Sequence, residues 1–258
     1  MEREIKVGRG EDEIDAFLIE NESKKGLIVI HEIFGLNEHI KNVARRFAKE
    51  GYVVLAPSLF SSKDMKDIAS EENIGLAMKI MFSIPPEKQR DIDYLVKEFE
   101  KHERRNELRR LVDLLFLNRP IERFTKELVE SARFLKEQCN VERVGSVGFC
   151  FGGGMSLNLA CTGEVDSAVT FYGENPKPID KIKGFKGSFL GIYAGEDSRI
   201  NAGIPELVRE MVDKKLPFHI KVYKGVHHAF FNDTGRNYNK EAAEDAYLLT
   251  KLHFSRTL

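Results

Sequence analysis

The chain has 258 residues, of which 40 are Lys or Arg and 41 are Asp or Glu, so its net charge is only −1. This balance provides no global field that would attract nucleic acid or an anionic membrane. A hydrophobic content of 42% argues against a disordered chain. The N-terminus is charged from residue 2, and no apolar run approaches the roughly 18 residues of a membrane span. We therefore expect a globular protein with neither a signal peptide nor a membrane anchor.

The three cysteines, Cys139, Cys150 and Cys161, indicate the compartment. An odd, small number in a chain of this length is no disulfide framework and favours a reducing cytoplasm. Their spacing of eleven residues matches no zinc-binding pattern. We expect a cytoplasmic protein with no metal and no cofactor.

The first predicted elements are an N-terminal hairpin and a parallel crossover unit. Residues 3–7 and 13–20 alternate apolar and polar side chains around a turn-like segment, as hairpin strands do. The apolar run Leu27–Ile30 predicts a strand that is covered on both faces. Asn37 is a typical N-cap for a helix with apolar residues at helical spacing, and Tyr52–Ala56 predicts a second buried strand. A strand, helix and strand with short links predict parallel pairing.

The pattern changes between Ser61 and Arg119, where no strand is predicted. Ten of the fourteen residues from Lys97 to Arg110 are charged, with mixed signs, which is typical of a solvated helix with i,i+4 ion pairs. A helical insertion that follows the carboxyl end of a strand would lie over the edge of the sheet. We therefore predict that residues 61–119 form a lid or an oligomer contact.

The alternation of helices and strands resumes after the insertion. The predicted elements are a helix through Ile121–Leu135, a strand at Val141–Val147, a helix near Gly153–Ala160, strands at Ser167–Tyr172, Ser188–Tyr193 and Phe218–Tyr223, and a final helix at about Lys240–His253. The fold class is therefore α/β, with a mostly parallel central sheet and helices on both faces. We predict a single domain over residues 1–258 that carries the helical insertion.

The segment Gly148-Phe-Cys-Phe-Gly152 is the strongest chemical signal in the chain. It joins a predicted strand to a predicted helix and has the form of a nucleophile elbow, with Cys150 where most such enzymes carry Ser. Glycines two residues before and after the nucleophile leave room for a sharp, strained turn. The following helix N-terminus favours the thiolate. The alternative is a glycine-rich turn that holds a buried structural cysteine.

Two later segments supply an acid and a base in the chain order that this fold uses. Asp197 follows an apolar strand and could orient an imidazole, while its neighbour Glu196 competes for that role. A loop after the last predicted strand carries His227 and His228, of which one is the expected base. The remaining histidines are expected to be surface or packing residues: His31, His39, His102, His219 and His253.

A fourth segment, His31-Glu-Ile-Phe-Gly35, follows the first predicted parallel strand. In an α/β-hydrolase this loop supplies one N–H of the oxyanion hole, and the residue after the nucleophile, here Phe151, supplies the other. Glu32 is unusual there, but a thiol can donate a hydrogen bond to a carboxylate. All four segments follow the carboxyl ends of predicted parallel strands, where open α/β sheets form their sites.

Together these segments resemble the dienelactone hydrolase family over most of the chain except about residues 61–119. The matching motifs are Glu32-Ile-Phe-Gly35, Gly51-Tyr-Val-Val-Leu-Ala-Pro57, Gly148-Phe-Cys-Phe-Gly-Gly153, Gly195-Glu-Asp197 and His228-Ala-Phe-Phe-Asn-Asp233. The resemblance implies an α/β-hydrolase fold with a catalytic triad of Cys150, Asp197 and His228. It also implies that Glu32 engages the thiol of Cys150, and that Ile33 and Phe151 donate the oxyanion-hole N–H groups.

The resemblance is less complete for the substrate. It implies a pair of arginines that bind a substrate carboxylate, one of them four residues after the catalytic histidine, where this chain has Asn232. Arg236 is close enough in sequence to substitute. The expected function is a cysteine-dependent hydrolase of small-molecule esters or lactones that acts through a thioester, as a monomer or homodimer. The alternatives are a thioesterase or acyl-transfer enzyme on the same fold, or a non-catalytic interaction protein.

Overall fold

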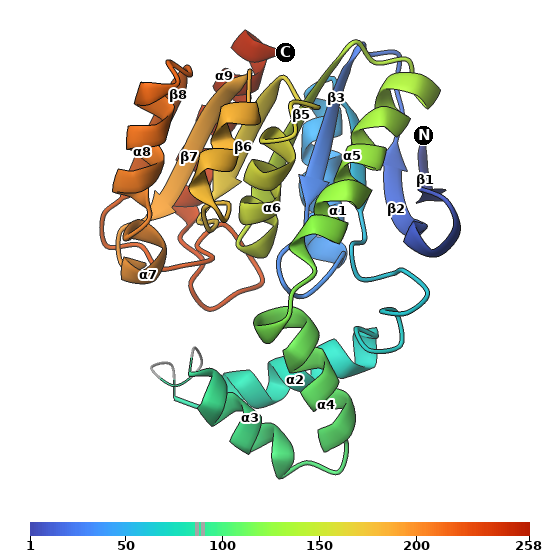
Figure 1. Cartoon of the computed structure of the whole chain (residues 1–258), viewed down its shortest axis with the longest axis vertical. Helices are drawn as coiled ribbons and strands as arrows, with labels where there is room; N and C mark the ends of the chain where they lie inside the picture. The colour runs from blue at the N-terminus through green and yellow to red at the C-terminus, as the bar shows by residue number, and fades with distance from the viewer. Residues whose placement is uncertain (86–87, 89–90) are drawn as a thin grey trace.

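A computed structural model describes residues 1–85, 88 and 91–258, and in these residues it forms one eight-stranded sheet (Figure 1). Its strands are β1 Glu2–Val7, β2 Ile14–Ile19, β3 Lys25–Ile30, β4 Val53–Pro57, β5 Arg143–Phe149, β6 Ser167–Phe171, β7 Ser188–Ala194 and β8 Phe218–Tyr223. The order across the sheet is β1-β2-β4-β3-β5-β6-β7-β8. Strands β1 and β2 pair antiparallel, as do β2 and β4, while all pairs from β4 through β8 are parallel. The predicted hairpin and the mostly parallel sheet are therefore confirmed.

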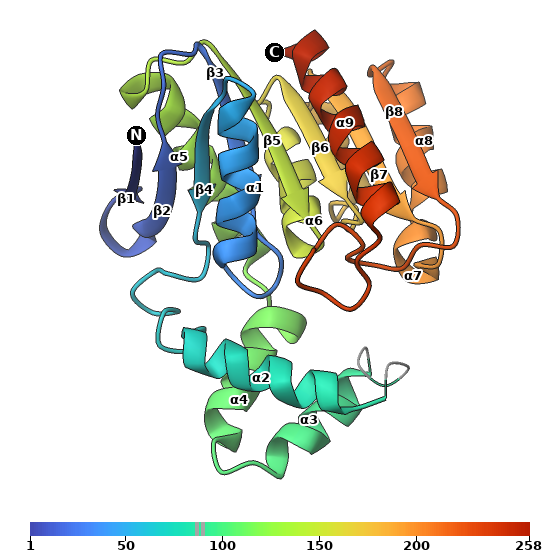
Figure 2. The same cartoon turned by 180° about the vertical axis from the view of Figure 1, so that it is seen from behind.

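Helices cover both faces of the sheet, as the alternation of elements predicted. The helices outside residues 61–119 are α1 Glu38–Lys49, α5 Ile121–Gln138, α6 Phe151–Ala160, α7 Ser198–Asn201, α8 Ile204–Asp213 and α9 Lys240–Thr257. Helices α5, α6 and α8 lie on one face, and α1 and α9 lie on the other (Figures 1 and 2). Asn37 caps α1 as expected, since its side chain accepts a 3.1 Å hydrogen bond from the N–H of Ile40.

Residues 61–119 form helices beyond the carboxyl ends of the parallel strands (Figures 1 and 2). They comprise α2 Glu71–Ser83, α3 Ile92–Glu100, α4 Arg105–Val112 and the π-helical turn η3 Asp113–Leu117, and the described part of this segment contains no strand. A small apolar cluster of its own joins these helices, formed by Ile84, Leu95, Phe99, Leu108 and Val112. None of the helices in the described residues is long and apolar enough to cross a membrane.

The strand register determines where the site can form. Ile30 of β3 is aligned with Gly148 of β5, so the residues two positions further along, Glu32 and Cys150, leave the same edge of the sheet side by side. Strands β6, β7 and β8 end at this edge as well. The segments that follow these strands therefore leave the sheet at its carboxyl edge, on the side where the insertion lies.

Candidate active site

Cys150 occupies a strained turn between β5 and α6. Its backbone has φ 54° and ψ −114°, a conformation that costs energy for a residue with a side chain. The flanking glycines are required by close backbone approaches. A Cβ atom on Gly148 would lie 1.8 Å from the carbonyl oxygen of Gly152, and one on Gly152 would lie 2.3 Å from the carbonyl oxygen of Ile30. The turn leaves the thiol of Cys150 partly exposed at the N-terminus of α6.

His228 is hydrogen-bonded through Nδ1 to Oδ2 of Asp197. Asp197 is fully buried behind the end of β7. Burial alone would lower the pKa of His228, but the negative charges of Cys150 and Asp197, together with their hydrogen bonds to the imidazole, raise it to about 10. The imidazole therefore lies between a buried carboxylate and the thiol, an arrangement that keeps its proton when the thiol is ionised.

Glu196 and His227, the alternatives to Asp197 and His228, are both exposed to solvent. Glu196 is exposed, and its Oε1 accepts a 3.2 Å hydrogen bond from the N–H of Gly225. His227 is exposed, whereas His228 is half-buried against the ring of Tyr172, with the ring centroids 4.8 Å apart. On each of the loops after β7 and β8, one of two adjacent residues therefore belongs to the Asp197–His228 pair and the other is exposed to solvent.

Glu32 is buried at the end of β3, and its hydrogen-bond partner is Asn232 rather than the thiol. The amide of Asn232 donates a 2.6 Å hydrogen bond to Oε2, while Oε1 of Glu32 is buried without a hydrogen-bond partner. Burial raises the pKa of Glu32, against the lowering effects of His39, Asn232 and His228. The expected contact of Glu32 with Cys150 therefore stays a prediction.

The two proposed oxyanion donors follow neighbouring strands, since Phe151 comes directly after Cys150 at the end of β5 and Ile33 follows β3, which pairs with β5. Phe151 is the first residue of α6, where backbone N–H groups have no acceptor within the helix. Ile33 follows Glu32 in a tight turn, in which the N–H of Gly35 donates a 3.1 Å hydrogen bond to the carbonyl of Glu32. Both N–H groups therefore belong to segments that leave the same edge of the sheet as Cys150.

Two further buried residues lie near the site. Tyr172 follows β6 with φ 42°, and its hydroxyl is buried. Burial and the nearby charges of Glu32 and Cys150 raise the pKa of this hydroxyl well above its usual value. His31, which was expected to be a surface or packing residue, is fully buried, and burial lowers its pKa to about 4.

His31 connects two loops at the edge of the sheet. Its Nδ1 lies 2.6 Å from the carbonyl of Glu32, and its Nε2 lies 3.1 Å from the backbone N–H of Leu59. Because the Leu59 N–H can only donate, Nε2 must be unprotonated and Nδ1 must carry the proton. The signal available in the sequence was the position of His31 at the end of a fully apolar strand.

The two expected substrate-binding side chains both contact the protein itself. Asn232 bonds to Glu32, as described above. Arg236 is exposed, and its guanidinium donates a 2.9 Å hydrogen bond to the carbonyl of Phe82 and lies 4.7 Å from the centre of that ring. Arg236 therefore joins the loop after His228 to the end of α2 in the insertion.

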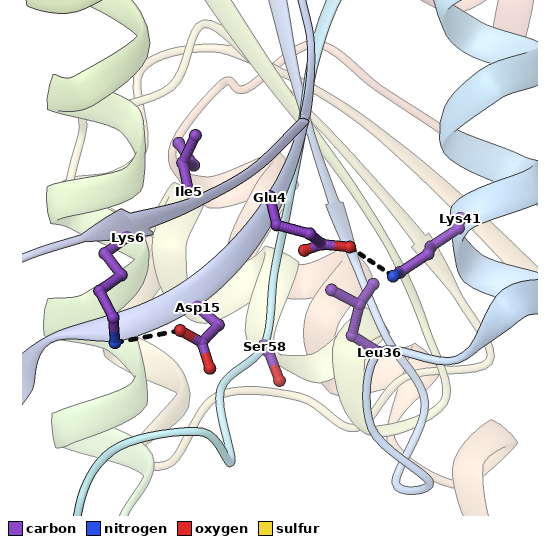
Figure 3. Close-up of a pocket in the computed structure, with 7 residues that line it drawn as sticks. All are labelled: Glu4, Ile5, Lys6, Asp15, Leu36, Lys41 and Ser58. Carbon is purple, nitrogen blue, oxygen red and sulfur yellow. Dashed lines mark hydrogen bonds and ion pairs between the residues drawn. The ribbon is translucent and has the colours of Figure 1, made fainter. Parts of the chain in front are cut away.

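A separate hollow of about 510 Å³ lies on the surface beside the N-terminal hairpin (Figure 3). The charged side chains in it neutralise one another. Lys41 Nζ lies 2.5 Å from Glu4, and Lys6 Nζ lies 3.1 Å from Asp15. The hollow is not lined by Cys150, Asp197 or His228.

The sheet order, the elbow at Cys150 and the chain order of acid and histidine define an α/β-hydrolase. The sequence profile of the dienelactone hydrolase family matches residues 14–258, and the chain belongs to that family. Membership identifies it as a hydrolase of carboxylic esters. The resemblance and the fold class that the sequence predicted are both confirmed.

The chain is similar to proteins from other organisms over nearly its whole length. It is 41% identical to a protein of Saccharolobus solfataricus that is provisionally named carboxymethylenebutenolidase, over 99% of both chains. A solved structure from Klebsiella pneumoniae, provisionally described as a dienelactone hydrolase, has a TM-score of 0.72 at 23% identity and covers 99% of this chain and 98% of its own. The dienelactone hydrolase of Anabaena variabilis has a TM-score of 0.67 at 17% identity, covering 100% of this chain and 98% of its own. At these identities the two structures show the fold alone.

Proposed function

We propose that the protein hydrolyses carboxylic esters or lactones with Cys150 as nucleophile, through a thioester acyl-enzyme. The observation that carries this proposal is the imidazole of His228, which lies between the buried Asp197 and the thiol of Cys150. A free thiol is only slightly ionised near neutral pH, so a nearby imidazole is needed to take its proton. The names of the relatives point to the same class of substrate, a small cyclic ester.

The proposed first step forms the thioester. The thiolate of Cys150 attacks the substrate carbonyl, and the N–H groups of Ile33 and Phe151 stabilise the negative oxygen that results. The tetrahedral intermediate collapses as the carbon–oxygen bond of the ester breaks. His228 then gives its proton to the departing alkoxide, which leaves as an alcohol or, from a lactone, as a hydroxyl on the opened ring.

The proposed second step releases the acid. His228, now neutral, takes a proton from a water molecule while the oxygen of that water attacks the thioester carbonyl. The carbon–sulfur bond breaks, and the thiolate of Cys150 is regenerated beside the imidazolium. Asp197 keeps Nε2 of His228 directed at the reacting atoms, because its carboxylate holds the proton on Nδ1. In the resting state, Glu32 would assist by accepting a hydrogen bond from the thiol of Cys150, before the thiol proton passes to His228.

Trapping the acyl-enzyme tests the proposal. An acid quench during turnover of a chromogenic acetate ester, followed by intact mass measurement, should show an added acetyl group on the wild-type chain. Cys150→Ala should show neither the adduct nor turnover, while Cys161→Ala, at a half-buried cysteine with a pKa raised by burial to about 12, should retain both. Full turnover in the folded Cys150→Ala variant would disprove the proposal.

A further inference from the structure

An apolar cavity lies between the active-site loop and the helical insertion. Phe34 of the loop forms one wall, and α2, α3, α4 and η3 form the others, with Met81, Leu95, Phe99 and Leu115 among the residues that line it. The ten lining side chains within the described part of the chain are all apolar, and the space they leave is about 20 Å³. That is room for about one methyl-sized group.

Phe34 links the cavity to the loop that would hold the substrate carbonyl. Phe34 directly follows Ile33, one of the two proposed oxyanion donors, and both side chains are half-buried. The ring of Phe34 also meets that of Phe82 at the end of α2, with centroids 6.4 Å apart. Helix α2 thus packs on the loop from the insertion side, below the carboxyl edge of the sheet (Figures 1 and 2).

Helix α2 has an unusual composition for its position. From Ile74 to Ile84 the sequence is Ile-Gly-Leu-Ala-Met-Lys-Ile-Met-Phe-Ser-Ile, with one charge, yet most of these side chains are only half-buried. One set contacts the main core and another contacts the small cluster of the insertion. A helix that is apolar on all sides is normally fully buried. Three of its side chains, Ile74, Ala77 and Met81, line the cavity.

The lining determines which part of a substrate could enter. An ionised carboxylate in this cavity would lose its hydration without gaining a partner. Furthermore, Arg236 and Asn232 are both hydrogen-bonded within the protein, to Phe82 and Glu32. A short alkyl group, by contrast, should gain about fourfold in kcat/KM for each methylene that is buried.

We propose that this cavity is the subsite for a short hydrocarbon part of the ester. The inference rests on the proposed function and specifies its substrate class. The small space sets an upper limit on the length of the hydrocarbon chain that can bind. The side chain of Met81 contributes to that limit, because it lines the cavity and is only half-buried. Two and three carbons fit by moving this flexible side chain, and longer chains do not.

Chain-length profiles test the subsite. We would measure kcat/KM for p-nitrophenyl esters from acetate to octanoate, and for acetates of alcohols of the same lengths. The wild-type profile should peak at a short chain. Met81→Ala should move the peak by two or more carbons and gain about fourfold per added methylene. If the peak shifts in the series that varies the acyl chain, the acyl side enters the cavity; if it shifts in the series that varies the alcohol, the alcohol side does.

Two further variants make the test specific. Met78→Ala makes the same change on the same helix outside the cavity and should leave the profile as in the wild type. Ala77→Leu fills the cavity and should restrict turnover to the acetate, which decides the case if Met81→Ala does not fold. Profiles of Met81→Ala and Ala77→Leu that run parallel to the wild type would overturn the subsite.

The same assay separates the subsite from the proposed function. If the wild type hydrolyses neither series, or if folded Cys150→Ala hydrolyses them equally well, the proposed function fails, and the subsite with it. If turnover requires Cys150 but the profiles do not respond to the volume of the cavity, only the subsite is wrong.

Discussion

The side-chain amide of Asn232 donates a 2.6 Å hydrogen bond to Oε2 of Glu32, although the two residues are 200 positions apart in the chain. The oxygen of the same side-chain amide fixes its orientation, because Oδ1 of Asn232 accepts hydrogen bonds of 3.0 and 2.7 Å from the N–H and hydroxyl of Thr234. Asn232 therefore stabilises the ionised form of a buried carboxylate that burial otherwise disfavours. The position at which the family resemblance implies a substrate-binding arginine serves here to hold Glu32.

The first prediction concerns the loss of this hydrogen bond. Asn232→Leu should raise the pKa of Glu32 further and lower the free energy of unfolding by about 1–3 kcal/mol at pH 8, because a buried carboxylate loses its donor. An acid with a raised pKa in the folded state destabilises the fold as pH rises above its unfolded value. The loss should therefore be smaller at pH 4, where Glu32 is protonated.

Urea titration at the two pH values measures this effect. Asn106→Leu, at an exposed position on α4, provides the matched control and should differ little from the wild type at either pH. An equal loss for Asn232→Leu at pH 4 and pH 8 would show that packing rather than the charge of Glu32 is responsible.

The second prediction concerns the charge of Asp197. Asp197→Asn should lower the pKa of His228 and reduce kcat by about 10⁴-fold, because the imidazole loses the group that sets its tautomer and stabilises its charge. NMR titration of the His228 ring and ester kinetics measure the two effects. Glu196→Gln removes a neighbouring charge that faces Gly225 and should leave both values close to wild type. Comparable losses in the two variants would argue against the assigned roles.

The pKa of His228 also makes stability depend on pH. A histidine whose folded pKa lies near 10, above its ordinary 6.5, contributes stability that is complete below pH 6.5 and is lost as pH rises toward 10. Asp197→Asn should weaken this alkaline loss. Thermal unfolding between pH 6 and pH 10 would show it as a flatter curve than that of the wild type.

Much of this arrangement could be predicted from the sequence, because its signals are local. The strained turn at Cys150 needs glycines at two nearby positions, and buried parallel strands need continuous apolar runs, so both leave a short-range pattern. The sequence favours Asp197 over Glu196 only through the family motif, since adjacent loop residues differ only in direction. The structure separates them by burial, which no local pattern encodes.

The partners of buried polar residues could not be predicted in this way. The contacts of Asn232 with Glu32 and of His31 with Leu59 depend on how distant strands are ordered in the sheet. The helical insertion lacks a recognisable motif, so neither the cavity next to Phe34 nor the contact of Arg236 with Phe82 had a signal in the sequence. Residues 86, 87, 89 and 90, within the predicted insertion, lie outside the described part of the chain.

The third prediction concerns acid stability and His31. Since burial lowers its pKa to about 4, its contribution to stability is present above pH 6.5 and is lost as pH falls toward 4. A shift of this size corresponds to at most about 3 kcal/mol. His31→Gln cannot be protonated and should flatten the acid side of the stability curve, at a cost of about 1–3 kcal/mol at pH 7 for imperfect hydrogen bonds.

Thermal unfolding from pH 4 to pH 8 tests this prediction, with the exposed His227→Gln as the control. His253, with a pKa that burial lowers to about 4, remains in both variants and should leave part of the acid loss in place. An acid slope in His31→Gln as steep as that of the wild type would contradict the buried, neutral state of His31.

The last prediction distinguishes two roles for Arg236. A side chain that bound a substrate carboxylate would be needed for a carboxylate-bearing lactone and not for a neutral ester. The guanidinium instead contacts Phe82 through a 2.9 Å hydrogen bond and a cation–π contact, which at an exposed position contributes about 0.5–1 kcal/mol. We therefore expect Arg236→Ala to change kcat/KM for both substrates by a similar factor, because it loosens α2 over the site. Arg209→Ala, at another exposed arginine, should change neither. A selective loss of about tenfold or more on the lactone alone would instead assign Arg236 to the substrate carboxylate, since that ratio corresponds to about 1.4 kcal/mol of binding energy.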